Sequence, residues 1–169
     1  MAKITRVSIF DMDGTIVCSL HRYKTIVDDN GERINLDYWR ENEYRAMDDS
    51  LLPLAEQYKA DLKDENCYVI IATARVLHAA DNKFISEILG EPDYIISRVD
   101  GDNVSGSKLK IAGLTKFFNL NNFKNAEFTF IFSFTGGKKI NYFINLIFHY
   151  CFSNHFSDLV LREYKRPEY

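Results

Sequence analysis

Residues 8–17 read Ser-Ile-Phe-Asp-Met-Asp-Gly-Thr-Ile-Val, and this stretch decides both the fold and the chemistry that the sequence predicts. The apolar run before Asp11 predicts a strand buried on both faces. Two carboxylates follow at a spacing that suits phosphoryl transfer: Asp11 can attack phosphorus, and Asp13 can protonate the leaving oxygen and later take a proton from water. Gly14 permits a sharp turn, and Thr15 offers a hydroxyl and a backbone N–H to phosphate oxygens. The alternative, a strand ending in an ordinary Asp-Gly turn, leaves Asp11 and Thr15 as coincidences.

Strand and helix patterns alternate along the rest of the chain. Apolar runs predict strands at residues 68–73, 94–96 and 128–134, and helical periodicity predicts helices at residues 36–42, 51–63, 76–89 and 107–118. This alternation predicts an α/β fold, a Rossmann-like parallel sheet with helices on both faces. We expect the core to span residues 1–127, with only a flap or minimal cap within residues 18–50. Residues 128–169 are expected to add a last core strand and an atypical tail rich in Phe.

Composition excludes several classes of protein. A net charge of −3 over 169 residues predicts no general nucleic-acid binding, although a local basic groove stays open. Cys18, Cys67 and Cys151 have no metal-ligand spacing and are odd in number, which predicts reduced thiols. The start of the chain has no apolar segment typical of a secretory signal, and residues 140–152 are too short and too polar for a membrane span. We therefore expect a cytoplasmic protein with no membrane partner. The sequence leaves the oligomeric state open.

Polar residues end the second apolar strand, where Thr73, Ala74 and Arg75 follow four apolar residues. Ligands of open parallel sheets bind beyond the carboxyl ends of the strands, so Thr73 can share one crevice with Asp11. Its hydroxyl can bond a phosphoryl oxygen, or it can cap a following helix. Arg75 can grip a substrate phosphate, and the alternative is a surface arginine at the start of a helix.

These segments resemble the haloacid dehalogenase (HAD) superfamily of phosphohydrolases. Residues 11–15 are similar to its first motif, Asp-x-Asp-x-Thr, and residues 69–75 are similar to its second, with Ala where phage and nucleic-acid-repair members often have Gly. The third motif of the family is a lysine, and residues 109–114 match the repair-type pattern. The resemblance therefore favours Lys110 over Lys108 as the lysine that neutralises charge beside the nucleophile.

The resemblance also implies a Mg²⁺ cofactor. In the family, the ion binds one oxygen of the first acid, the backbone carbonyl of the second and an acid of a fourth motif. Here Asp11 and Asp13 occupy the first two positions, but residues 135–139, where the fourth motif should follow its strand, contain no acid. The next acid, Asp158, lies in the Phe-rich tail and is not expected to substitute. Asp100 and Asp102 precede the lysine and are expected to be solvated loop acids.

The resemblance implies a Mg²⁺-dependent phosphatase of phosphomonoesters that acts through an aspartyl-phosphate intermediate, with Asp11, Asp13, Thr73 and Lys110 as catalytic residues. Phosphate contacts are expected from Gly14, Thr15, Ala74 and Arg75. The substrate is expected to be a phosphorylated small molecule such as a nucleotide, or a nucleic-acid end, and the aromatic residues Tyr23, Tyr38 and Trp39 can either stack on a base or simply pack. The rival hypothesis is a catalytically impaired phosphate-ester-binding protein that lacks the fourth acid. Similarity to small phage-encoded HAD proteins implies a host cytoplasm as the location.

Overall fold

The computed structural model describes residues 3–29, 31–133 and 141–146. A five-stranded sheet with the order β7-β6-β1-β8-β9 lies at its centre. Four strands are parallel, and β9 runs antiparallel to β8 at one edge. In chain order these strands are β1 (Arg6–Asp11), β6 (Cys67–Val76), β7 (Tyr94–Arg98), β8 (Glu127–Ser133) and β9 (Asn141–Leu146). The predicted α/β class with a Rossmann-like parallel sheet is confirmed.

Strand β1 lies in the middle of the sheet and is buried on both faces, as its apolar sequence predicts. It pairs with β6 in a register that places Asp11 beside Ala72, and it pairs with β8 on its other side. Val7 and Ile9 belong to the core on one face of the sheet, and Phe10 belongs to the core on the other. Parallel strands end at a common edge, so the acids after Phe10 and the polar end of β6 meet there.

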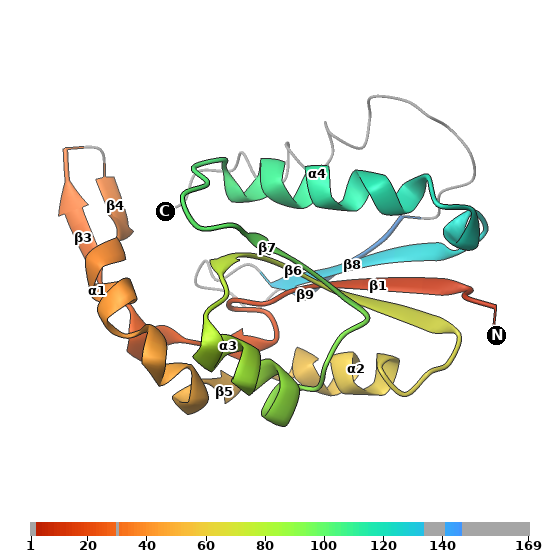
Figure 1. The fold of residues 1–169 in the computed structure, drawn as a ribbon, viewed down its shortest axis with the longest axis horizontal. Helices are drawn as coiled ribbons and strands as arrows, with labels where there is room; N and C mark the ends of the chain where they lie inside the picture. Colours follow the sequence, from red (N-terminus) through yellow and green to blue (C-terminus); the bar gives the residue numbers. More distant parts are fainter. Residues whose placement is uncertain (1–2, 30, 134–140, 147–169) are drawn as a thin grey trace.

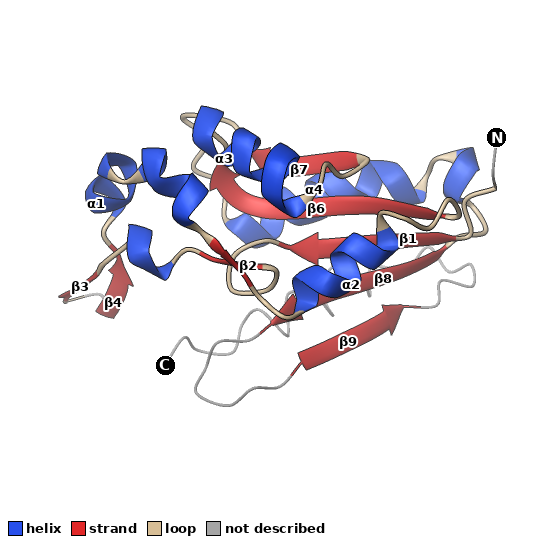
Figure 2. Cartoon of the chain, turned by 90° about the horizontal axis from the view of Figure 1, so that it is seen from below, coloured by secondary structure: helices blue, strands red, loops and turns tan. Residues whose placement is uncertain are grey.

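Helices cover both faces of the sheet. Figure 1 shows α4 (Gly106–Phe118) on one face and α2 (Leu54–Asp61) and α3 (Ala79–Phe84) on the other, and Figure 2 shows this second pair from below. Tyr58 of α2 packs edge-on against Phe10, with ring centroids 5.3 Å apart. These contacts form one hydrophobic core on each face of the sheet.

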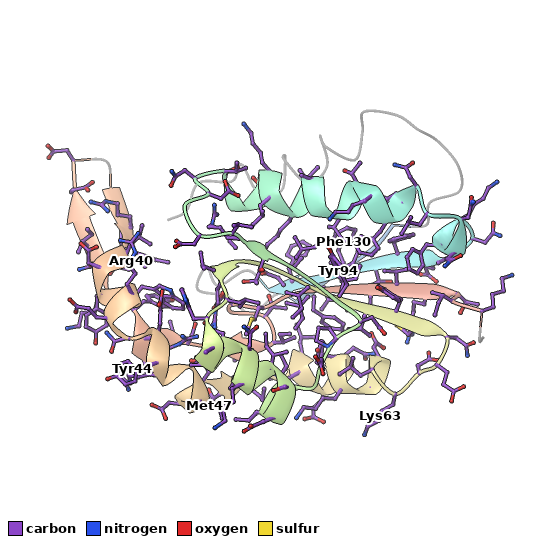
Figure 3. The ribbon with its side chains drawn as sticks, viewed as in Figure 1. Arg40, Tyr44, Met47, Lys63, Tyr94 and Phe130 are labelled. Atoms are coloured by element: carbon purple, nitrogen blue, oxygen red, sulfur yellow. The ribbon has the colours of Figure 1, made fainter. Side chains whose placement is uncertain are left out.

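The core under α4 is rich in aromatic rings. Phe117 of α4 lies 4.9 Å from the ring of Tyr94 in β7 and 5.9 Å from that of Phe123. Figure 3 places Tyr94 and Phe130 of β8 on this side of the sheet. The packing fixes α4 over the sheet and thereby the direction in which its side chains reach the end of β1.

Residues 17–51, which we call the insert, project from the end of the sheet where β1 finishes (Figure 1). Strands β2 (Val17–Cys18) and β5 (Ser50–Leu51) pair at its base. Between them lie the 3₁₀ helix η1 (Leu20–Arg22), the hairpin β3 (Thr25–Asp28) and β4 (Gly31–Ile34), the helix α1 (Leu36–Glu41) and the 3₁₀ helix η2 (Glu43–Asp48). The Asn35 side chain caps α1 by accepting from the Tyr38 N–H over 3.1 Å. Tyr44 lies on the outer side of the insert (Figure 3) and is 73% exposed.

The starts of three helices differ from the sequence prediction. The helix expected from residue 51 begins only at Leu54, because Ser50 and Leu51 pair with β2 and Pro53 suits the start of a helix. Strand β6 continues to Val76, so the next helix starts at Ala79, and its final turn is the π-helical segment η3 (Ile85–Leu89), closed by Gly90. Helix α4 starts at Gly106 rather than at residue 107, and Ser105 caps it.

The predicted strand near residue 130 is present as β8. Residues 134–140 and 147–169, which include the segment expected to hold a fourth motif and Asp158, lie outside the described residues. Within the described part of the chain, none of the helices is long and apolar enough to span a membrane.

Candidate active site

Asp11 ends β1 and is held in place by two donors. The Lys110 ammonium of α4 donates to its Oδ1 over 2.7 Å, and the Met12 N–H donates to the same oxygen over 2.9 Å. Both hydrogen bonds that Asp11 accepts from the described residues therefore end on Oδ1. Burial raises the pKa of Asp11, and the opposing effect of Lys110 does not fully offset it.

The chain turns sharply after Asp11. The Met12 carbonyl accepts from the N–H groups of Thr15, Ile16 and Val17 over 3.0–3.3 Å, and Gly14, with a φ of 70°, donates its N–H to the Val17 carbonyl over 2.9 Å. Only glycine adopts such a φ without strain. The turn thus engages the N–H groups of Gly14 and Thr15 internally, and the expected phosphate contacts of both residues stay predictions.

Asp13, two residues later, has a different partner. Arg75 donates from Nε to both carboxylate oxygens over 3.0 and 2.9 Å and also from Nη2, and Ser19 donates to Oδ1 over 2.9 Å. Burial alone would raise the pKa of Asp13, but the charge and hydrogen bonds of Arg75 and Ser19 outweigh burial and lower it. Its side chain is 41% exposed, so it can reach a molecule bound at the edge of the sheet.

The polar end of β6 carries Thr73, Ala74 and Arg75. Thr73 is fully buried, and its hydroxyl accepts from the Arg75 N–H over 3.2 Å; it does not cap a helix, since His78 precedes α3. Ala74 is exposed, and its carbonyl accepts from Arg98 over 2.9 Å.

The Arg75 side chain is only 3% exposed and lies inside β6, so the alternative of a surface arginine at a helix start is wrong. Its guanidinium contacts Asp13, Asp49 and Asp81. A grip on the substrate phosphate stays a prediction for Arg75, beside this observed role.

A buried ion-pair network extends from Arg75 into the insert. Arg22 of η1 is fully buried and donates to both oxygens of Asp49 over 2.9 and 2.7 Å and to Asp81 over 2.9 Å. Asp49 and Asp81 also contact Arg75, at 3.4 and 2.8 Å. Burial raises the pKa of Asp49, although Arg22 opposes it. The sequence gives no signal that these residues form a network. Apart from Arg75 and Asp81, the paired residues lie 26–59 positions apart in the chain.

Trp39 of α1 packs on this network. The guanidinium carbons of Arg22 and Arg75 lie 4.6 and 5.2 Å from the centre of its ring. Tyr23 lies 6.3 Å from Trp39, and the Lys24 ammonium lies 4.4 Å from the ring of Tyr38. The ring of Trp39 therefore packs on cations of the protein itself. Of the two roles that the sequence left open, stacking on a base or packing, the structure shows packing for Trp39.

Of the two candidate lysines, Lys110 is the one that reaches Asp11, while Lys108 is exposed. The two acids before α4 serve local turns: Asp100 accepts from the Gly101 N–H and Asp102 from the Val104 N–H. The structure thus brings Asp11, Asp13, Arg75 and Lys110 together at one edge of the sheet, with Thr73 two residues before Arg75.

The side chains of the site determine whether it could hold a metal ion. In the described part of the chain, no three His, Cys, Asp or Glu side chains group in a way that could hold a metal ion. Mg²⁺ requires few protein ligands, however, because it keeps waters and binds substrate phosphate, and carboxylate and carbonyl oxygens are its preferred donors. Ion pairs among the described residues of the site join four carboxylates, Asp11, Asp13, Asp49 and Asp81, to three cations, Arg22, Arg75 and Lys110. A phosphate adds more negative charge, so the site chemistry fits an additional cation.

Comparison with known proteins identifies the family. Residues 1–98 match the family described as Bacteriophage T5 5'-deoxynucleotidase. The 5'-deoxynucleotidase of Escherichia phage T5 is 37% identical over 90 residues, which cover 48% of this chain and 34%, about a third, of that protein. No solved structure matches the chain. The family match includes Asp11, Asp13, Thr73 and Arg75 and ends before Lys110. Since it spans more than half of the chain and contains the acidic turn after β1, this protein belongs to the bacteriophage T5 5'-deoxynucleotidase family.

Proposed function

We propose that this protein is a Mg²⁺-dependent phosphatase of the HAD type that removes the phosphate from a nucleoside monophosphate. The observation that carries the proposal is the placement of Asp11 at the end of β1 against the Lys110 ammonium, 2.7 Å away. A carboxylate fixed there through one oxygen has its other oxygen available for attack on phosphorus. The name of the phage T5 relative supports a nucleotide as the substrate.

The first step forms a bond between Asp11 and phosphorus and breaks the bond between phosphorus and the nucleoside oxygen. Asp13 gives its proton to that oxygen, so a neutral hydroxyl leaves. In the second step Asp13 takes a proton from water, which attacks phosphorus, releases inorganic phosphate and restores the Asp11 carboxylate. Lys110 stabilises the negative charge beside Asp11, and the Thr73 hydroxyl is proposed to orient the phosphoryl group.

Asp13 must carry a proton in the first step, while Arg75 and Ser19 lower its pKa in the free protein. Negative charge raises the pKa of a nearby carboxyl group. A phosphate bound against Asp11 therefore counteracts Arg75 and favours the protonated form of Asp13 in the complex. The general acid is accordingly formed when substrate binds.

Mg²⁺ would be held by the Asp11 carboxylate and by Asp13 through its backbone carbonyl. The bound ion would neutralise phosphate charge, which the three cations of the site cannot balance alone. Because few protein ligands are present in the described residues, we expect binding to be weak without substrate and to tighten when phosphate oxygens complete the coordination.

The test measures phosphate release from deoxynucleoside and ribonucleoside monophosphates and from an oligonucleotide with a terminal phosphate, each with Mg²⁺ or with EDTA. We expect Mg²⁺-dependent release from a nucleoside monophosphate by the wild type and none above background by Asp11→Asn. Asp61→Asn is the matched control, since Asp61 is also a largely buried, ion-paired carboxylate but pairs with Arg6 at the opposite end of β1. Turnover by Asp11→Asn close to that of Asp61→Asn would contradict the proposal.

A second candidate is a phosphate-ester-binding protein with impaired catalysis. The observation in its favour is that, among the described residues, no third His, Cys, Asp or Glu groups with Asp11 and Asp13 in a way that could hold a metal ion. A Mg²⁺ titration separates the two candidates. Saturable, metal-dependent turnover supports the phosphatase, and nucleotide binding measured by calorimetry without turnover supports the binding protein.

A further inference from the structure

Arg22 is a buried cation that belongs to the insert and yet lies in the network that holds Asp13. Its side chain has no exposed surface, and it donates to Asp49, Asp81 and the Glu43 carbonyl. The insert also contributes an aromatic ring to this network. Trp39 packs against the guanidinium groups of both Arg22 and Arg75. A buried charge is tolerated only with such partners.

Asp49 and Asp81 are shared between two arginines, and Asp49 Oδ1 also lies 3.5 Å from Nε2 of His21. Each contacts Arg22, and each also contacts Arg75. Arg75 in turn is the cation that holds Asp13. The orientation of the Arg75 guanidinium therefore depends on how much of the charge on Asp49 and Asp81 is already balanced by Arg22.

Burial decides what happens when Arg22 is absent. The side chains of Asp49 and Asp81 are 0% and 1% exposed, whereas that of Asp13 is 41% exposed. A fully buried carboxylate without a cation costs far more free energy than one that water can solvate. Without Arg22, Arg75 would be drawn to Asp49 and Asp81, and it would leave Asp13 to solvent.

We propose that Arg22 is a positioning residue for Asp13, acting through Asp49, Asp81 and Arg75. The inference rests on the proposed function, in which Asp13 is the general acid and base. It makes the insert part of the catalytic machinery, because a residue of η1 sets the position of a carboxylate after β1. Arg22 does not touch Asp13, and its effect passes through the balance of charge.

The first measurement is independent of turnover. In nitrogen-15 NMR spectra the Arg75 Nε–Hε group, assigned by its loss in Arg75→Lys, reports the hydrogen bond to Asp13 through its chemical shift and slow solvent exchange. We expect Arg22→Met to shift this signal and to speed its exchange. The matched control is Arg6→Met, which removes an arginine from the Asp61 and Asp64 pairs at the other end of β1 and should leave the signal unchanged.

The second measurement is kinetic. Arg22→Met should lower kcat for the nucleoside monophosphate by about tenfold or more, as expected for an impaired general acid, with KM changed by less than about threefold. Arg22→Lys should give an intermediate loss, because one ammonium cannot reproduce the bidentate contact with Asp49. Arg6→Met should keep kcat even where it lowers Tm.

A double variant tests whether unbalanced buried charge is what draws Arg75 away from Asp13. It also replaces Arg22→Met in these measurements if that variant does not fold. Arg22→Met combined with Asp81→Asn removes one buried cation and one buried anion, and Asn keeps an acceptor for the His78 N–H. We expect it to recover most of the kcat and the Arg75 signal. A double variant as impaired as Arg22→Met, or an Arg22→Met protein that matches Arg6→Met in both measurements, would overturn the inference. If the wild type hydrolyses no nucleotide, the proposed function fails, while the NMR signal still decides whether Arg22 holds Arg75 on Asp13.

Discussion

At the scale of single residues, two carboxylates two positions apart have opposite environments. Asp11 pairs with Lys110, and burial raises its pKa; Asp13 pairs with Arg75, which outweighs burial and lowers its pKa. Pairs of acids whose surroundings separate their pKa values are typical of active sites that need two different roles. The difference between the pKa values of Asp11 and Asp13 arises only in the folded protein, since both carboxyl groups have the same ordinary pKa of 3.8.

Asp11→Asn should raise Tm at pH 7 in the presence of EDTA. The pKa of Asp11 is higher in the folded than in the unfolded protein, so the folded protein binds its proton more tightly, and stability falls as pH rises above the ordinary value of 3.8. Asn avoids this cost at neutral pH. Thermal unfolding at pH 7 and at about pH 3 checks the sign, because the advantage should vanish where Asp11 is protonated in both states. A lower Tm for Asp11→Asn at pH 7 would contradict the assigned environment.

Asp13→Asn should have the opposite effect and lower Tm at pH 7. The pKa of Asp13 is depressed in the folded protein, so its ionised form contributes stability above 3.8, and that contribution is lost as pH falls through the folded pKa. The same thermal experiment measures it, with Asp11→Asn as the matched substitution two residues away. Equal changes of Tm with the same sign in both variants would show that Asp11 and Asp13 do not have opposite environments. The variant should also lose about 10²- to 10⁴-fold in kcat, since the proposed general acid is removed.

At the scale of secondary-structure elements, α4 carries the lysine that pairs with Asp11, 99 positions away in the sequence. The distance between α4 and the sheet is set at Gly113, one turn after Lys110. A Cβ atom at Gly113 would lie 2.6–3.0 Å from side-chain atoms of Ile96 in β7. The absence of a side chain at this position therefore allows the close approach.

Gly113→Ala should destabilise the protein and lower kcat. Alanine gains about 1 kcal/mol in helix propensity over glycine, but overpacking costs about 1–3 kcal/mol and displaces α4, and Lys110 with it. Chemical denaturation and the nucleotidase assay measure both effects. The control is Ala112→Gly at the exposed neighbouring position, which should cost about 1 kcal/mol of stability without a loss of kcat. A Gly113→Ala protein more stable than the wild type would show that Ile96 does not limit the approach.

At the scale of the whole molecule, the insert is anchored to the core at its base and inner side, while its hairpin extends away from the sheet (Figure 1). The residues described in β3 and β4 are exposed or half-buried, and the Asn35 N–H donates to the Lys24 carbonyl over 2.8 Å where the hairpin begins and ends. The chain can therefore be rejoined there with little rearrangement.

Replacement of residues 25–34 by Gly-Gly should leave Tm within a few degrees of the wild type, because the hairpin buries little apolar surface. Phosphate release from a nucleoside monophosphate should persist, since Asp11, Asp13 and Arg22 all lie outside the deleted segment. Thermal unfolding and the phosphatase assay measure the two outcomes. A loss of the cooperative transition would show that the hairpin supports the core.

Much of the fold follows from local sequence. The apolar runs of β1, β6 and β8 predict buried parallel strands, and residues 11–15 locate the acidic turn. Helix starts were predicted less well: Pro53 and the pairing of Ser50 and Leu51 with β2 delay α2. Periodicity cannot reveal such long-range pairing, because it reflects only neighbouring residues.

The site was predictable only in part. The pairing of Lys110 with Asp11 was expected from the family resemblance, but the network of Arg22, Asp49 and Asp81 was not. Arg22 and Asp49 lie in the segment expected to form a flap or minimal cap, and Asp81 lies in a predicted helix; only tertiary packing buries all three. Charged residues are rarely buried unless they are paired, and such pairing has no signature in a single sequence.

If Asp11 is the nucleophile, it becomes covalently phosphorylated during turnover, and this intermediate can be trapped. The enzyme is quenched in acid while it hydrolyses a nucleoside monophosphate with Mg²⁺, treated with borohydride, which converts an aspartyl phosphate to homoserine, and mapped by peptide mass spectrometry. We expect homoserine at position 11 in the wild type and in Asp61→Asn. Steady turnover with an unmodified Asp11, or with the mark on another residue, would contradict it.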